Sequence, residues 1–152
     1  MKSDIIIGAV GALATGIAIG TQSTLSSLIG ALVGNLRTGM FMNFIGGIIA
    51  GLFILAITLI GGKGYWQIPG KAVWMLVIAG ALGILIITGV SFSLQRTGVT
   101  AGLATIILGQ LVLSVIVDAT GAGGVKVIPF NWQRGIGLLV IALGVYLILP
   151  KK

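Results

Sequence analysis

The sequence has 152 residues, of which 57% are hydrophobic and only 7% are charged, and its mean hydropathy is +1.22. An average soluble domain carries about 25% charged residues, so this composition argues against a water-soluble enzyme or nucleic-acid-binding domain. The chain has no Cys and no His, which removes the side chains of thiol, imidazole and zinc chemistry. A paired-carboxylate hydrolase would need its two acidic residues together, yet Asp4 lies at the amino terminus and Asp118 at the end of an apolar run. We therefore expect no enzyme activity, no metal, no cofactor and no nucleic-acid partner.

Five continuous apolar runs follow one another along the chain, and a membrane helix needs about 20 predominantly apolar residues. The runs lack the alternation of barrel strands, so we predict an all-α integral membrane protein. The short polar stretches 34–38 and 95–98 suggest tight antiparallel hairpins, and Trp66, Trp74 and Trp132 are expected at the membrane interface. The expected helices, within a single transmembrane domain covering 1–152, are 5–33, 39–60, 72–94, 99–117 and 132–149.

The cations are divided almost evenly between the two sides of such a five-helix protein. Five of them lie on the side of the amino terminus, and four lie on the opposite side: Lys2, Lys63, Lys71, Lys126 and Arg134 against Arg37, Arg96, Lys151 and Lys152. Because orientation follows the Lys/Arg bias, a difference of one predicts insertion either way up. Two opposed copies would form an antiparallel homodimer with the inverted-topology symmetry of many transporters. A fixed orientation, set by hydrophobicity or by partners, is the alternative.

Polar side chains inside the apolar runs are the candidate solute-binding residues, because an unpaired amide in lipid costs several kcal/mol. Amides occur at Gln22, Asn43 and Gln110, and two polar stripes follow the helical repeat on the third and fourth helices. Bonds between helices, or from a hydroxyl to its own helix, are the alternative role. The candidate cavity residues are Gln22, Ser26, Asn43, Phe44, Thr88, Ser91, Phe92, Gln110 and Ser114.

The chain has two carboxylates, Asp4 and Asp118, and both lie at the ends of the apolar runs. Asp118 ends the stripe formed with Gln110 and Ser114, near a helix end, where it could pair with Lys126 or couple transport to protons. The apolar part of the first helix has no Asp or Glu, whereas a proton-coupled exporter of cations would need a carboxylate deep in the membrane. The sequence therefore favours a polar, neutral or weakly charged solute, with Phe44 and Phe92 supplying stacking surface.

Four segments together carry a family resemblance. They are Gln22–Leu28, Asn43–Gly47, the Gly109–Gln110–Leu111 step leading to Asp118–Gly121, and Gln133–Gly137. In this order and spacing they resemble the YdcZ-type family, small bacterial five-helix members of the drug/metabolite transporter superfamily. The resemblance implies an antiparallel homodimer or a pair of opposed paralogues. It also implies a central cavity that is lined by the first, third and fourth helices and includes Gln22 and Gln110. The chain lacks the first-helix Glu of the related small multidrug resistance transporters, so the resemblance does not imply their proton-exchange mechanism.

These expectations combine into one functional hypothesis. We expect a secondary-type transporter of small polar or aromatic organic solutes in the bacterial inner membrane, working by alternating access as a dual-topology dimer. A small anion or solute channel is one alternative, since hydroxyl-lined pores can conduct. A non-transporting membrane assembly subunit, whose interior amides are fully paired between helices, is the other.

Overall fold

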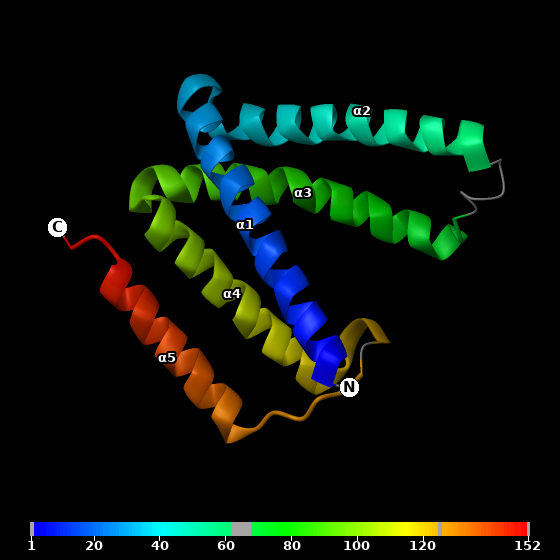
Figure 1. The fold of residues 1–152 in the computed structure, drawn as a ribbon. Helices are drawn as coiled ribbons and strands as arrows, with labels where there is room; N and C mark the ends of the chain where they lie inside the picture. The colour runs from blue at the N-terminus through cyan, green and yellow to red at the C-terminus, as the bar shows by residue number, and fades with distance from the viewer. Residues whose placement is uncertain (1, 62–67, 125, 152) are drawn as a thin grey trace. The chain divides into compact units, whose positions relative to one another are not determined.

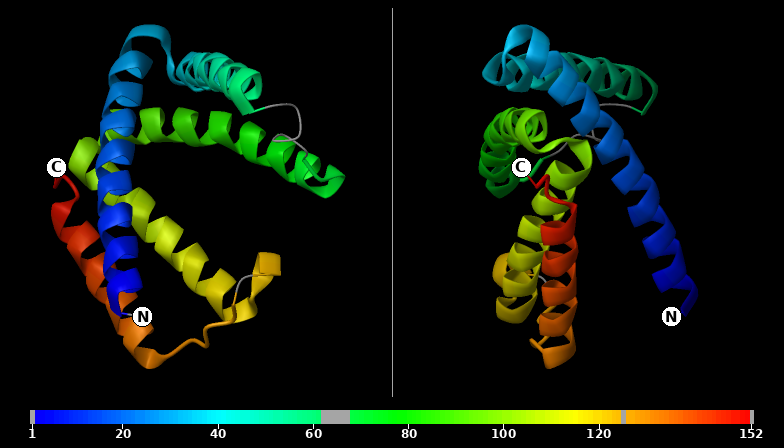
Figure 2. Two further views of the ribbon diagram at one scale, coloured as in Figure 1. Left: turned by 45° about the vertical axis from the view of Figure 1, so that its right-hand side comes forward. Right: turned by 90° about the vertical axis from the view of Figure 1, so that its left-hand side faces the viewer.

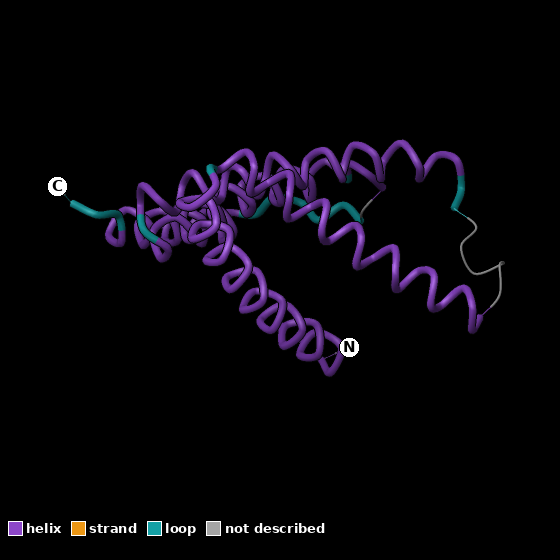
Figure 3. The backbone as a smooth tube through the Cα atoms, turned by 90° about the horizontal axis from the view of Figure 1, so that it is seen from above, coloured by secondary structure: helices purple, strands orange, loops and turns teal. Residues whose placement is uncertain are grey.

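The computed structural model describes residues 2–61, 68–124 and 126–151, and all regular structure in these ranges is helical (Figure 3). This confirms the all-α prediction and its five α-helices. A short 3₁₀ turn, η2, follows the fourth helix. The elements, labelled in Figure 1, are α1 (Lys2–Val33), α2 (Asn35–Gly61), α3 (Gly70–Thr97), α4 (Val99–Thr120), η2 (Ala122–Gly124) and α5 (Trp132–Ile148).

Four of the helices are long enough and apolar enough to cross a membrane. They are Ile5–Val33 within α1, and the whole of α2, α3 and α4. The apolar helix α5 has 17 residues, which is at the lower end of the range of about 17–25 residues for a span. The surface matches a lipid environment, because the buried hydrophobic side chains in the described ranges are few (Leu94, Ala101 and Val145) and most large apolar side chains point outward.

The chain divides into two compact units, residues 1–92 and 93–152. In the first unit, α2 and α3 run antiparallel and side by side, and they are in contact near the start of α2 (Figures 1 and 2). The carboxyl-terminal part of α1 packs on this unit through Ser23, Ser26 and Gly30, which are buried. The preceding part of α1, residues 5–19, is exposed along its whole length.

One glycine alone turns the chain from α1 into α2. Gly34 has a φ of 91°, in the left-handed region that residues other than glycine avoid. Its N–H donates to the Gly30 carbonyl at 2.9 Å, and its carbonyl accepts from the Thr38 backbone N–H at 3.0 Å and from the Thr38 Oγ1 at 2.9 Å. The hairpin expected over 34–38 is therefore a one-residue corner, and α2 begins at Asn35 rather than at residue 39.

The second unit contains the last turn of α3 together with α4 and α5. Gly98, with a φ of 77°, makes a similar corner into α4. The linker from α4 to α5 returns along the helix end, where the Ile128 N–H donates to the Asp118 carbonyl at 2.9 Å. Asn131 caps α5, because its side chain accepts the Arg134 backbone N–H at 2.9 Å.

The aromatic side chains expected at the interface lie near the starts of two helices. Trp74 is in the second turn of α3 and Trp132 is the first residue of α5, and both are largely exposed. These positions fit an interfacial belt. Trp66 lies outside the described residues.

Candidate functional site

Two helices of the first unit, α2 and α3, approach closely at Gly39. A Cβ added to this glycine would lie 2.6 Å from the backbone carbonyl oxygen of Ile84 and would also collide with the Oγ1 of Thr88. The two backbones can therefore approach this closely only because residue 39 is glycine. Such contacts through small residues replace the hydrophobic drive that is missing between helices in lipid.

Two buried serines join the helices of this unit by hydrogen bonds. The Ser91 hydroxyl of α3 donates to the Asn35 Oδ1 of α2 at 2.8 Å, and the Ser26 hydroxyl of α1 donates to the Ile87 carbonyl of α3 at 3.3 Å. Ser91 and Ser26 are 0% and 1% exposed, so neither hydroxyl can be satisfied by solvent. Bonds of this kind between membrane helices contribute on average about 0.6 kcal/mol each.

Asn43 lies next to this contact, one turn beyond Gly39. Its Nδ2 donates to the Gly39 carbonyl at 2.8 Å, and its Oδ1 faces Gly83, where an added Cβ would approach it to 2.7 Å. Thr88 on the facing helix donates to the carbonyl of Ile84 at 2.7 Å. The half-buried Asn43 amide is thus held in a fixed orientation at the junction of α2 and α3.

An open groove of about 760 Å³ begins at this junction. Its volume is within the range of about 300–1,000 Å³ typical of small-molecule sites. It combines aromatic and thioether surface with one amide and one guanidinium. Its lining residues are Arg37, Met40, Phe41, Asn43 and Phe44 from α2, with Gly80 and Ile84 from α3.

The structure distributes the expected cavity residues over several environments. Asn43 and Phe44 line the groove, and Phe44 is 66% exposed. Ser26, Thr88 and Ser91 lie in the helix contacts beside it, whereas Phe92, at the end of the first unit, is exposed. Gln22 on α1 and, in the second unit, Gln110 and Ser114 on α4 are also exposed. The first unit therefore brings together five of the expected residues, at the groove or in the contacts next to it.

The polar stripe of α4 ends in an ion pair. An oxygen of Asp118 lies 3.1 Å from an Arg134 guanidinium nitrogen, so Asp118 pairs with Arg134. The sequence suggested Lys126 as the partner, and this prediction was wrong. The capped first turn of α5 brings Arg134 to this position, whereas Lys126 lies in the exposed linker. The two side chains are about one-third exposed. Within residues 2–61, 68–124 and 126–151, no three acidic, His or Cys residues gather into a metal-binding group.

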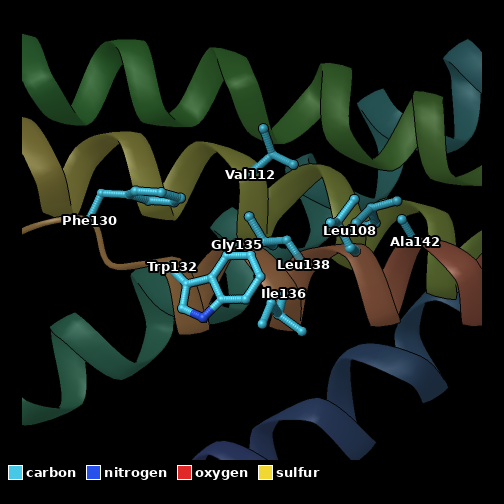
Figure 4. Close-up of a pocket in the computed structure, with 9 residues that line it drawn as sticks. Leu108, Val112, Phe130, Trp132, Gly135, Ile136, Leu138 and Ala142 are labelled. Carbon is cyan, nitrogen blue, oxygen red and sulfur yellow. The ribbon is translucent and has the colours of Figure 1, made fainter.

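The second unit has a pocket of its own, of about 540 Å³, between α4 and α5 (Figure 4). Phe130 and Trp132 stand at one end, and Leu108 and Ala142 stand at the other. The lining is aliphatic and aromatic throughout, with the indole nitrogen of Trp132 as its polar side-chain atom. Such a surface can accept apolar groups, but it offers little to orient a polar solute.

Five of the seven residues that line the α2–α3 groove were not identified from the sequence. Arg37 was treated only as a cation that marks a loop, and no binding role was expected for Met40, Phe41, Gly80 and Ile84. The signal was present, because Arg37, Met40, Phe41 and Phe44 follow one another at steps of three, one and three residues and share one helix face. Starting the helix at residue 39 left Arg37 outside it and concealed this face.

The comparisons with known proteins agree with this architecture. Residues 7–147 match the family described as "Putative inner membrane exporter, YdcZ". No curated protein and no solved structure matches the chain. The match covers nearly the whole sequence, including every α-helix that forms the groove and the α4–α5 pocket. With its apolar helices exposed for contact with lipid, the chain belongs to the YdcZ family of inner membrane exporters and is a multi-pass transport protein of that membrane.

Proposed function

We propose that this chain is a secondary transporter of small polar or aromatic organic solutes that works by alternating access as an antiparallel dimer. The family supports transport across the inner membrane. The division of cations, five on one side and four on the other, supports insertion in both orientations. Two opposed copies would then present one groove to each side of the membrane, as inverted repeats do within single-chain transporters.

The observation that carries the proposal is the pair of exposed amides on the membrane helices. Gln110 lies at the middle of α4, and Gln22 lies on the exposed side of α1. Among the described residues, neither side-chain amide has a hydrogen-bond partner. An amide cannot satisfy itself locally, and lipid tails offer neither donor nor acceptor. A second protomer, or an aqueous cavity between two protomers, would supply the missing partners.

The assembly-subunit alternative has one specific observation in its favour. The hydroxyls of Ser26 and Ser91 are used in bonds within the first unit and are not available to a solute. The groove and the two exposed amides favour transport instead. Saturable counterflow of a labelled solute in proteoliposomes would support a carrier. Single-channel currents would support a channel, and the absence of both would support the assembly role.

The dimer is tested by topology and by paired variants. A reporter fused to the carboxyl terminus should be found on both sides of the membrane, and a single exclusive location would refute dual topology. Changing both Gln22 and Gln110 to Leu should abolish solute flux while the protein remains folded in detergent. Gln133→Leu is the matched control, because this exposed amide lies in the first turn of α5, away from mid-membrane depth. Flux that survives the double substitution would remove these amides from the site.

A further inference from the structure

The groove between α2 and α3 has a polar end and an apolar end. Arg37, in the first turn of α2, is followed on the same helix face by Met40, Phe41 and Phe44. The three apolar side chains are 54%, 58% and 66% exposed, so their surfaces are available to another molecule. From Arg37 to Phe44 the helix rises about 10 Å, which leaves room along the groove for a small aromatic molecule with one polar substituent.

The α3 side of the groove leaves the apolar face of α2 open. Gly80 of α3 lines the groove, and a Cβ added there would meet nothing within 4 Å. Gly83, one turn away, is in contact with the Asn43 side chain, so the space is open at Gly80 and closed at Gly83. A flat ring could therefore lie over Gly80 against the aromatic face of α2.

The charge in the groove is uncompensated. The chain has two acidic residues, Asp4 and Asp118, and the second is paired with Arg134 in the other unit. No carboxylate in the described ranges pairs with Arg37, and the first turn of α2 contains no acidic residue. The positive end of the α2 dipole adds to the field of the guanidinium, and both favour an anion. A cation entering the groove would meet like charge.

We propose that the groove binds organic anions, with the anionic group on Arg37 and an aromatic or apolar body against Phe41 and Phe44. A planar guanidinium can hold a carboxylate through two parallel hydrogen bonds, which makes Arg better suited than Lys to this role. This inference rests on the proposed transport function and names the substrate class of the same site. The proposed ligand is a water-soluble solute. An anionic lipid is the competing ligand, because its headgroup could also supply an anionic group to Arg37.

Three probes that share one ring but differ in charge test the substrate class. Benzoate, benzamide and benzylamine are anionic, neutral and cationic at neutral pH. Binding of each is measured by competition with labelled benzoate on the full chain in phosphatidylcholine nanodiscs. We expect benzoate to bind about tenfold more tightly than benzamide, with benzylamine weakest, because a charge-assisted bond to Arg37 is available only to the carboxylate.

Variants of Arg37 test whether the preference for benzoate over benzamide arises in the groove. Arg37→Gln should weaken benzoate binding about tenfold and bring it close to benzamide, while Arg37→Lys should keep part of the preference. Arg96→Gln is the matched control, since it removes the same charge from the same side of the membrane outside this groove. Thermal unfolding without ligand checks that each variant remains folded.

Several outcomes would overturn the inference. These are equal binding of the three probes, preference for the amine, no binding by any of them, or a benzoate preference that persists in Arg37→Gln. Stabilisation by phosphatidylglycerol that depends on Arg37, without binding of benzoate, would assign the groove to lipid and also overturn it. Counterflow of a neutral or cationic solute would leave the transport proposal standing while this inference fails.

Discussion

The helix pairs α2–α3 and α4–α5 are held together by different means. The first pair meets backbone to backbone at Gly39, with the Ser91–Asn35 hydrogen bond beside the contact. The second pair meets along apolar side chains, with the Asp118–Arg134 ion pair where the linker returns. The polar atoms in both pairs join helices, but only the first pair leaves a guanidinium uncompensated next to an open groove. A charge that is already paired serves packing, whereas a charge without a partner remains available for a ligand.

The largest effect is expected at the backbone contact. Gly39→Ala should destabilise the protein by about 1–3 kcal/mol, because the carbonyl of Ile84 cannot move aside as a side chain can. In the second unit, the atoms nearest to an added Cβ in Gly102→Ala belong to the Leu94 and Thr97 side chains and not to backbone, and the cost should be largely offset by the helix propensity of Ala, about 1 kcal/mol.

Thermal unfolding in detergent compares these two substitutions. Gly46→Ala, which meets nothing within 4 Å, is the control and should be neutral or slightly stabilising. Equal losses at Gly39 and Gly102 would contradict the distinction between backbone and side-chain contacts.

Filling the groove should reduce binding rather than stability. Gly80→Leu places a side chain in the open space between α3 and the Phe41–Phe44 face, so benzoate binding should fall about tenfold or more. The same substitution at Gly51, which is also open but lies outside the groove, should leave binding unchanged. Competition binding and unfolding temperature are measured on the same samples, and intact binding in Gly80→Leu would place the ligand elsewhere.

The two arginines should act oppositely on membrane orientation. Arg37→Gln lowers its side from four cations to three against five, whereas Arg134→Gln leaves four on each side. Because orientation follows Lys/Arg and depends little on acidic residues, only the first change should move the carboxyl terminus outward, and the second should move it inward. Paired reporter fusions measure the ratio, and a shift in the same direction for both variants would contradict the charge-balance argument.

The smallest effect is expected at the ion pair. Asp118→Asn should cost about 0.2–1 kcal/mol, because both side chains are one-third exposed and water screens the attraction. A double-mutant cycle with Arg134→Gln isolates the coupling between the two residues. Benzoate binding should be unaffected, and a large loss of binding in Asp118→Asn would show that the second unit takes part in the site.

The five helices could be predicted from the sequence because continuous apolar runs have few other stable forms in lipid. The corner at Gly34 could not, since a left-handed φ at one residue can replace a loop whose polar residues look like a longer turn. Asn43 and Phe44 were identified as candidates from residue type alone, and the structure places both in the groove lining. Arg37 was not identified, because a cation near a helix end satisfies the topology rule equally well. The partner of Asp118 depended on the path of the linker, which periodicity does not encode.

The one-residue corner at Gly34 has a consequence for the direction of the first helix. One backbone hydrogen bond lies on each side of it, from the Gly34 N–H to the Gly30 carbonyl and from the Thr38 N–H to the Gly34 carbonyl, so a single residue joins α1 to α2. Arg37 is three residues beyond this corner, and the exposed stretch 5–19 lies on its other side. Because no loop separates the two helices, the backbone angles of Gly34 set the direction of the exposed stretch relative to the groove.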